Sequence, residues 1–345
     1  MIKEAIAKLV ERIDLEEHEM SEVVEMMMEG AATTGQISAF LIALRMKGES
    51  VSEITGAARV MLDKATRLNS KHEVIVDLCG TGGDRQGTFN VSTAAAFVVA
   101  GAGVPVAKHG NRSVSSYVGS ADVLEALGAD ISHSAEVARK CLDEAGIVFL
   151  FAPLYHPAMK NVAGPRKDIG VRTIFNILGP IANPAGVKHQ VIGVYSEMLL
   201  DPMIKVLRNL GHKSAMVVHG SDSMDEITVT GKTIVAELRD GMVKKYQFDP
   251  SDVGIKRWSA SELKGGRTAK ENAKILLSVL KGEEREAKRD IVLINAAAAI
   301  YVSETSPDIN DALGRAVESI DSGKALSKLN ELVKITKDKQ SPKDG

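Results

Sequence analysis

The sequence predicts a small all-helical N-terminal domain followed by a larger α/β domain with a mostly parallel central sheet. Two observations lead to this class. Apolar residues recur at helical spacing through the first 65 residues, and from Glu73 onward short β-type runs alternate with helical segments. Such alternation is typical of a parallel sheet covered by helices. We therefore expect a helical domain over 1–65 and an α/β domain over 70–345.

Length and charge exclude several classes of protein. The chain has 345 residues, enough to bury a large core. Its 43 Lys and Arg against 45 Asp and Glu give a net charge of −2, so no basic field indicates a nucleic-acid partner. The N-terminus carries charges throughout, and no apolar run reaches the ~20 residues of a membrane helix. Only two cysteines are present, Cys79 and Cys141, which fits a reducing cytosol, so we expect a cytoplasmic protein without membrane contact.

Four helices are expected in the first 65 residues. Gly30 should end the second helix, and Thr34 and Ser52 should mark the starts of the third and fourth. The first two helices each carry a stripe of apolar residues: Ile2, Ile6, Leu9, Val10 and Ile13, then Met20, Val23, Val24, Met27 and Met28. Methionine-rich faces of this kind usually belong to a core.

The α/β part should contain five main strands and a hairpin. The hairpin is expected from Thr228–Thr230 and Thr233–Val235 around Gly231-Lys232. A polar tail, KDKQSPKDG, closes the chain. The strands are expected near 74–78, 104–107, 147–151, 191–195 and 215–219, and later helices near 270–281, 288–303 and 308–323.

The first strand runs into a glycine-rich loop that predicts a phosphate site. Gly80, Gly82 and Gly83 follow the strand, and a helix is expected to begin near Ser92. Glycines let the backbone turn and present N–H groups to an anion, and a helix N-terminus adds more of them. A Walker loop is excluded because Gly87 is followed by threonine rather than lysine, and the dinucleotide fingerprint lacks its third glycine. The other interpretation of the loop is an ordinary strand–helix turn.

Two further polar segments support an anion site. Lys108-His109-Gly110-Asn111-Arg112 follows the next strand, at the edge of a parallel sheet where ligands collect. The adjacent carboxylates of Asp225-Glu226 can hold Mg²⁺, which prefers one or two carboxylates plus substrate phosphates. Taken alone, the first segment also fits a surface turn and the second a solvated acidic loop.

These segments, in this order, resemble the anthranilate phosphoribosyltransferases. The resemblance rests on GTGGD with NVST, KHGNR, Gly119-Ser120-Ala121-Asp122, the Asp225-Glu226 pair and the segment PLYHPAMKNVAGPRKDIGVRTIFNILGPIANP, and it runs from about position 1 to 330. It implies the nucleoside phosphorylase-type phosphoribosyltransferase fold, in which about 160–185 joins the helical domain and that domain forms a homodimer. It also implies transfer of a phosphoribosyl group from phosphoribosyl pyrophosphate to anthranilate in tryptophan biosynthesis.

The resemblance also implies the site residues. For phosphoribosyl pyrophosphate they are Gly80, Gly83, Asp84, Thr88, Asn90, Val91, Ser92, Thr93, Lys108, His109, Gly110, Asn111, Arg112, Ser113, Ser115, Ser116 and Ser120. For anthranilate they are Gly80, His109, Asn111, His156 and Arg166. Two Mg²⁺ ions per subunit would be bound through Ser92, Asp225 and Glu226.

Elementary chemistry agrees with that assignment. Departure of pyrophosphate leaves an oxocarbenium-like sugar and an anion, so a metal and N–H donors should do most of the stabilisation. An aromatic amine is already uncharged at neutral pH, so no covalent nucleophile or dedicated base is expected. The guanidinium of Arg166 matches a carboxylate, although a surface ion pair in its RKD run is the alternative.

Three alternatives remain at this point. The first is a pyrimidine-nucleoside phosphorylase-like enzyme, for which the acidic pair would have no purpose, and the second is a phosphoribosyltransferase for a related aminobenzoate. The third, a nucleic-acid-binding relative without activity, should show a basic groove. Arg85, Gln86, Tyr117 and Val118 depart from the common family pattern and bear on the identity of the acceptor, while His219 is left without a role.

Overall fold

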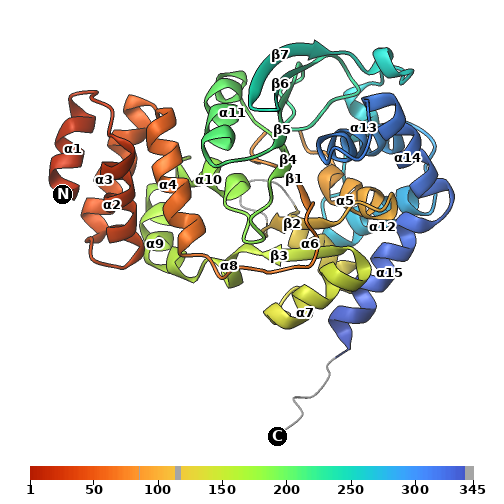
Figure 1. The fold of residues 1–345 in the computed structure, drawn as a ribbon, viewed down its shortest axis with the longest axis horizontal. Helices are drawn as coiled ribbons and strands as arrows, with labels where there is room; N and C mark the ends of the chain where they lie inside the picture. Colours follow the sequence, from red (N-terminus) through yellow and green to blue (C-terminus); the bar gives the residue numbers. More distant parts are fainter. Residues whose placement is uncertain (85, 113–117, 339–345) are drawn as a thin grey trace, which may run out of the picture.

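The structure is a computed structural model and describes residues 1–84, 86–112 and 118–338. Its centre is a seven-stranded sheet with the strand order β3-β2-β1-β4-β5-β6-β7 (Figure 1). The pairs from β3 to β5 are parallel, and β6 and β7 extend the sheet as antiparallel strands. The strands are β1 (Val76–Gly80), β2 (Val106–Gly110), β3 (Ile147–Phe151), β4 (His189–Gly193), β5 (Ser214–Gly220), β6 (Thr233–Arg239) and β7 (Met242–Phe248). The predicted mostly parallel sheet is confirmed, and its five parallel strands match the predicted runs with small shifts at their ends.

The direction in which strands are added reverses between β1 and β4. The chain places β2 and β3 on one side of β1, then returns to add β4 and β5 on the other side. Ligands of open parallel sheets bind outside the carboxyl ends of the strands at such a reversal. Here those ends are Gly80 and Gly193, which are partners in the parallel register.

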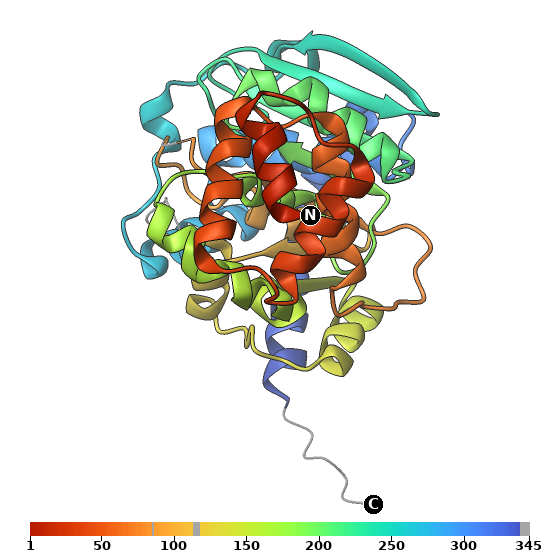
Figure 2. The ribbon, with the colours of Figure 1, turned by 90° about the vertical axis from the view of Figure 1, so that its left-hand side faces the viewer.

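Four helices form the N-terminal bundle, and Figure 2 shows them side by side in front of the sheet. Thr33 caps α3, because its hydroxyl accepts a hydrogen bond from the N–H of Gln36 at 3.3 Å, and the helix begins at Thr34. Ser50, rather than the predicted Ser52, begins α4, because its hydroxyl accepts from the N–H of Glu53 at 3.3 Å. The helices are α1 (Ile2–Val10), α2 (Glu17–Met28), α3 (Thr34–Lys47) and α4 (Val51–Asp63).

The chain after β3 returns to this bundle. Helices α8 (Ala152–Tyr155), α9 (Lys160–Ile169) and α10 (Phe175–Ile181) follow β3, and α9 packs against α2 and α3. Val162, Phe175 and Leu178 join the apolar cluster of the bundle. The same cluster continues through α11 (Leu200–Asn209) to one face of β4, β5 and β6.

A second apolar cluster covers the other face of the sheet. Helix α13 packs on α5, β1, β4 and β5, and α14 and α15 pack against α5 on its outer side (Figure 1). The C-terminal helix α15 has no counterpart among the predicted elements. The helices of this half are α5 (Val91–Gly101), α6 (Ser120–Ala126), α7 (Ala135–Lys140), α12 (Ala269–Leu280), α13 (Ala287–Val302), α14 (Ile309–Asp321) and α15 (Lys324–Lys337). Among the described residues, no helix is long and apolar enough to cross a membrane.

The predicted hairpin around Gly231-Lys232 is wrong. The antiparallel pair is β6–β7, and its two-residue turn is Asp240-Gly241, with φ of 51° and 75°. Two positive φ angles define the turn type that favours Asp-Gly, so the sequence carried this signal one strand later than expected. Thr228 and Thr230 do not form a strand, because their hydroxyls donate to the carboxylate of Asp222 at 2.7 and 2.6 Å.

Candidate active site

The glycine loop and the acidic pair meet at the carboxyl edge of the sheet. The backbone N–H of Gly82 donates to Oδ2 of Asp225 at 2.6 Å, although the two residues are 143 positions apart. Gly82 lies just after β1, and Asp225 lies in the loop after β5. The structure therefore brings together two of the three segments that the sequence singled out.

Two glycines leave the space that Asp225 occupies. A methyl group added to Gly80 would lie 2.2 Å from Oδ2 of Asp225, and one added to Gly193 would lie 1.6 Å from its carbonyl oxygen. Real Cβ atoms do not approach heavy atoms so closely, so both positions require glycine while Asp225 stays in place. Gly193 was not among the predicted site residues. No local pattern marks it, because its neighbour comes from a distant loop.

Negative charge accumulates at this point. Removal from water raises the pKa of Asp225, and the nearby carboxylate of Asp84 raises it further. Removal from water likewise raises the pKa of Glu226, with Asp225 as the next cause, while the cation of Lys108 acts in the opposite direction. Three carboxylates in a poorly hydrated place favour a bound cation. Among the described residues, no three His, Cys, Asp or Glu side chains are arranged to hold a metal by themselves.

The start of α5 and the end of β2 lie next to this cluster. The ammonium of Lys108 is buried and donates to the carbonyl of Leu78 at 2.6 Å and to the hydroxyl of Ser92 at 3.1 Å. Asn90 precedes α5, and its amide donates to the carbonyl of Val118 at 3.2 Å. The positive end of α5 therefore faces the same region as the glycine loop.

Two further residues predicted to bind phosphoribosyl pyrophosphate, Arg112 and Ser120, form bonds with other parts of the chain. Arg112 binds the carboxylates of Asp122 and Glu125 at 2.8 and 2.6 Å, so its charge is already paired. Ser120 donates to the carbonyl of Asn111 at 3.3 Å at the start of α6.

Other predicted site residues lie within helices and strands or at their ends. Thr88 forms an isolated bridge with Lys264, Val91 and Thr93 are buried in the first turn of α5, and Gly110 ends β2. Ser113, Ser115 and Ser116, with Arg85 and Tyr117, lie outside the described residues.

Two histidines form the inner wall of the expected acceptor region. The rings of His109 and His156 lie with their centroids 5.1 Å apart, and Nδ1 of His109 bonds to the carbonyl of Gly179 at 3.1 Å. Burial lowers the pKa of His109 to about 3 and also lowers the pKa of His156. Both rings are therefore neutral at pH 7. Nε2 of His109 and both ring nitrogens of His156 have no hydrogen-bond partner among the described residues.

Arg166 lies on α9, beside the start of α10. Its guanidinium stacks over the ring of Phe175 at 5.1 Å. Among the described residues no carboxylate forms an ion pair with it, so the surface pair considered from the RKD run is not present there. Removal from water lowers its pKa, which means that a carboxylate ligand would stabilise the charged form.

Arg172 is a second cation that the sequence did not single out. Its Nη2 donates to the carbonyl of Gly83 at 3.2 Å, and its guanidinium lies 4.1 Å from the ring centroid of Tyr195. It thereby ties the segment before α10 to the glycine loop. His219 instead bonds through Nδ1 to the carbonyl of Val194 at 2.7 Å, a structural contact.

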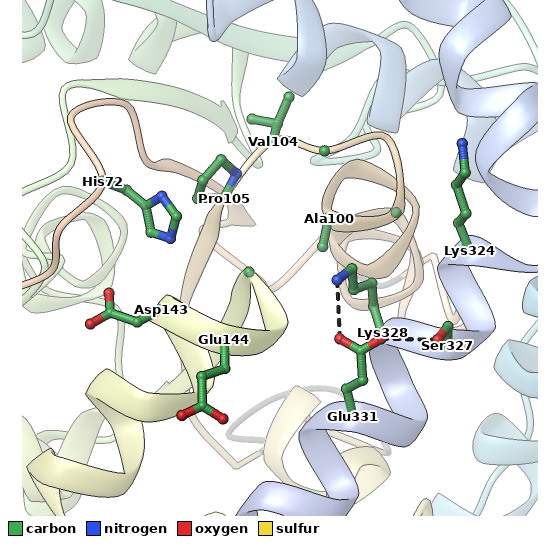
Figure 3. Close-up of a pocket in the computed structure, with 13 residues that line it drawn as sticks. His72, Ala100, Val104, Pro105, Asp143, Glu144, Lys324, Ser327, Lys328 and Glu331 are labelled. Atoms are coloured by element: carbon green, nitrogen blue, oxygen red, sulfur yellow. Dashed lines mark hydrogen bonds and ion pairs between the residues drawn. The ribbon is translucent and has the colours of Figure 1, made fainter.

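A separate cavity of about 380 Å³ lies away from these residues (Figure 3). It opens at the amino ends of β2 and β3, beside α15, and so at the opposite end of the sheet from the carboxylates. The two lysines of its lining are already paired, Lys324 with Glu318 at 2.8 Å and Lys328 with Glu331 at 3.0 Å. We therefore place the functional site at the carboxyl edge.

Comparison with known proteins shows similarity over almost the whole chain. Residues 72–326 match the a/b domain of a glycosyl transferase family, and residues 3–65 match its helical bundle domain. The chain is 54% identical over 336 residues to an anthranilate phosphoribosyltransferase of Pelotomaculum thermopropionicum, covering 97% of each sequence.

Two solved structures have the same fold. The anthranilate phosphoribosyltransferase of Thermus thermophilus superposes with a TM-score of 0.91 at 41% identity, covering 96% of this chain and 99% of that one. The enzyme of Saccharomyces cerevisiae in complex with PRPP and Mg superposes with a TM-score of 0.88 at 29% identity, covering 97% of each.

Proposed function

The chain belongs to the glycosyl transferase family with a helical bundle domain and an a/b domain, and on this basis we propose that it transfers a phosphoribosyl group to anthranilate. The donor is phosphoribosyl pyrophosphate. The products are N-(5-phosphoribosyl)anthranilate and pyrophosphate, so the reaction belongs to tryptophan biosynthesis. The acidic pair has a use in this reaction and none in a nucleoside phosphorylase, which favours the transferase.

One observation carries the proposal: the contact between Gly82 and Asp225. It joins a loop suited to phosphate with a carboxylate suited to a metal, at the carboxyl edge beside the strand reversal. A magnesium-bound diphosphate on a sugar needs both groups within a few ångströms of each other.

The residues present fit Mg²⁺. Asp225, Glu226 and Asp84 place three carboxylates close together where water is scarce. The carboxylate of Asp84 raises the pKa of both Asp225 and Glu226, and Asp225 raises that of Glu226 as well. We propose that Ser92, Asp225 and Glu226 hold two ions per subunit. When bound, Mg²⁺ would offset the charge of the departing pyrophosphate.

The chain's own groups account for donor binding. The N–H groups of Thr81 and Gly82 donate to Gly193 and Asp225, so we propose that the phosphates are bound by other N–H groups of the glycine loop and by the first turn of α5. Lys108 on β2 donates a hydrogen bond to the hydroxyl of Ser92 and contributes positive charge to the site. These donors are fixed by the sheet before the substrate arrives, so little reorganisation opposes the reaction.

We infer that the acceptor is bound between the two histidines and Arg166. The neutral rings of His109 and His156 can line a path for an aromatic amine without charging it. Arg166 would bind the carboxylate and orient the amine toward the anomeric carbon. Alignment of this kind can supply roughly 7–11 kcal/mol of the barrier reduction, so no nucleophilic side chain is required.

A fluorescence assay tests the function directly. Anthranilate fluorescence should fall only when phosphoribosyl pyrophosphate and Mg²⁺ are both present. Phosphorolysis of a pyrimidine nucleoside with inorganic phosphate, tested on the same protein, should be absent. Faster consumption of another aminobenzoate than of anthranilate would transfer the proposal to that acceptor.

Arg166→Ala should raise the KM for anthranilate about 10- to 100-fold, since a charge-assisted contact is lost. The KM for phosphoribosyl pyrophosphate should stay within about two-fold, because Arg166 lies outside the donor loop. Steady-state kinetics with each substrate varied in turn measures both values. Equal increases in the KM values for the two substrates would show that Arg166 does not bind the acceptor specifically.

We also propose a homodimer formed through the helical bundle. Val10 at the end of α1, Ile13 in the loop after it and Met46 near the end of α3 are 66%, 52% and 73% exposed. An ion pair between Asp14 and Lys47 ties this loop to the end of α3. Exposed apolar residues at one end of a bundle are typical of an interface.

The double variant Val10→Glu with Ile13→Glu should therefore change the mass in solution from twice 36.8 kDa to 36.8 kDa. Light scattering after gel filtration measures this mass. Met242→Glu, at an equally exposed methionine on β7, is the control and should leave the dimer intact. A dimer that persists in the double variant would place the interface elsewhere.

A cytoplasmic location is the remaining part of the proposal. Cys79 and Cys141 are both free thiols, as expected for a reducing compartment. Fractionation of cells that express the chain should recover its activity with the cytosolic enzymes.

A further inference from the structure

Two buried asparagines outside the predicted site lie directly behind it. Asn183 and Asn295 are each 2% exposed, and each uses its side-chain amide for three hydrogen bonds. The first anchors the chain that forms the acceptor wall, and the second anchors the loop that carries the acidic pair.

Asn183 fixes the segment between α10 and β4. Its Nδ2 donates to Oδ2 of Asp77 and to the carbonyl of Ala107, both at 2.8 Å, and its Oδ1 accepts from the N–H of Ala185 at 2.9 Å. These contacts tie the segment to β1 and β2 underneath the expected acceptor region.

The same segment determines how His109 is oriented. Oδ1 of Asp77 accepts from the backbone N–H of His109 at 3.4 Å, and α10 brings the carbonyl of Gly179 to the ring nitrogen at 3.1 Å. Gln190 donates to Asp77 at 3.2 Å and to the carbonyl of Pro180 at 2.6 Å, so the segment keeps a second attachment when Asn183 is replaced.

Asn295 fixes the residue that follows the acidic pair. Its Oδ1 accepts from the N–H of Ile227 at 3.0 Å, and its Nδ2 donates to the carbonyl of Ile227 at 2.9 Å. A third bond, to the carbonyl of Ile291 at 2.8 Å, holds the amide in place on α13. The N–H and the carbonyl of Ile227 are thus both bonded to the side chain of Asn295, since Ile227 lies between β5 and β6 and not in a strand.

We propose that Asn183 and Asn295 are positioning residues, each for one substrate: Asn183 for the aromatic acceptor and Asn295 for the magnesium-bound donor. The inference rests on the proposed function. It follows from the separation of the two sets of side-chain hydrogen bonds among the described residues. Those of Asn183 go to Ala185, to Ala107 and to Asp77, which also bonds to His109, whereas those of Asn295 go to Ile227 and Ile291.

The two variants Asn183→Ala and Asn295→Ala are controls for each other, because residue type, burial and number of bonds are equal. Asn183→Ala should raise the KM for anthranilate about 10-fold or more, since small misplacement of a binding wall has large effects. Asn295→Ala should raise the KM for phosphoribosyl pyrophosphate and the Mg²⁺ concentration at half-maximal rate by a similar factor. In each variant the KM for the other substrate should change by less than about two-fold.

Calorimetric titration of each ligand provides a measurement independent of turnover. Dissociation constants for anthranilate and for Mg²⁺ with phosphoribosyl pyrophosphate should show the same split. Ser319→Ala is the control for buried side chains far from the site, because Ser319 is 1% exposed and its hydroxyl donates to the carbonyl of Val98 at 2.7 Å. It should leave all of these constants unchanged.

The outcomes are distinguishable. A wild-type protein that neither binds nor converts the two substrates would overturn the proposed function and this inference with it. An active wild type whose variants lose affinity for both substrates equally, or for neither, would overturn the inference alone. Where an alanine variant does not fold, Asn183→Ser and Asn295→Ser replace it, and failure of these too would assign both asparagines to fold stability and overturn the inference.

Discussion

The double variant Asp225→Asn with Glu226→Gln should lose at least about 10²–10³-fold in kcat/KM while its Tm in metal-free buffer rises. The loss of activity follows because both amides are uncharged and bind Mg²⁺ poorly. The gain in stability follows because the raised pKa values show that the folded protein disfavours the charged carboxylates. Above those pKa values each carboxylate lowers the free energy of unfolding, and its neutral amide removes that penalty.

Kinetics and thermal unfolding, each with and without Mg²⁺, measure the two effects. Mg²⁺ should raise the Tm of the wild type and leave that of the double variant unchanged. Glu283→Gln with Glu284→Gln makes the same chemical change at another adjacent acidic pair and should affect neither property. Normal turnover by the double variant at limiting Mg²⁺ would show that the metal is held elsewhere.

Gly193→Ala should reduce kcat/KM by about 100-fold or more through displacement of the loop after β5. The new methyl group would lie 1.6 Å from the carbonyl oxygen of Asp225 and 2.2 Å from its carbonyl carbon. These are backbone atoms, so no side-chain rotation relieves the overlap and the whole turn must move away from Gly82. Overpacking of this kind also costs about 1–3 kcal/mol of stability.

Kinetics together with chemical denaturation separates the two consequences of this change. Gly80→Ala should behave similarly but less severely, because its closest contact is the side-chain oxygen of Asp225 at 2.2 Å. Gly314→Ala, on α14 with no atom within 4 Å of the added methyl group, should be neutral or slightly stabilising. Full activity in Gly193→Ala would mean that the position of Asp225 is unimportant for turnover.

Local patterns predicted the fold well because its main features are local. Strand-like runs followed by glycines and helical stripes predicted the parallel sheet and the N-terminal helices. The predicted hairpin at Gly231-Lys232 is wrong because the two-residue turn lies at Asp240-Gly241, where both φ angles are positive.

The site was predictable only in part. Gly82 and Asp225 could each be singled out from sequence, and the resemblance linked them before any contact was known. Gly193 could not be predicted, because the residue that leaves no room for a side chain there is Asp225, in the loop after β5. Asn183 and Asn295 carry no local signal either, since a buried amide and an exposed one look alike in a sequence. The roles assigned to individual site residues remain predictions.

The apolar cluster that runs from the bundle into the sheet bears on how this enzyme can be recombined with its relatives. Ile54 and Met61 of α4, Leu207 of α11 and Val217 of β5 belong to one continuous cluster. A chimera that exchanges only residues 1–65 would pack the side chains of a relative against α10 and α11 of this chain. Voids or clashes would then form within the shared apolar cluster. A chimera that exchanges α9 to α11 together with the bundle keeps more of the contacts of this cluster and should fold better.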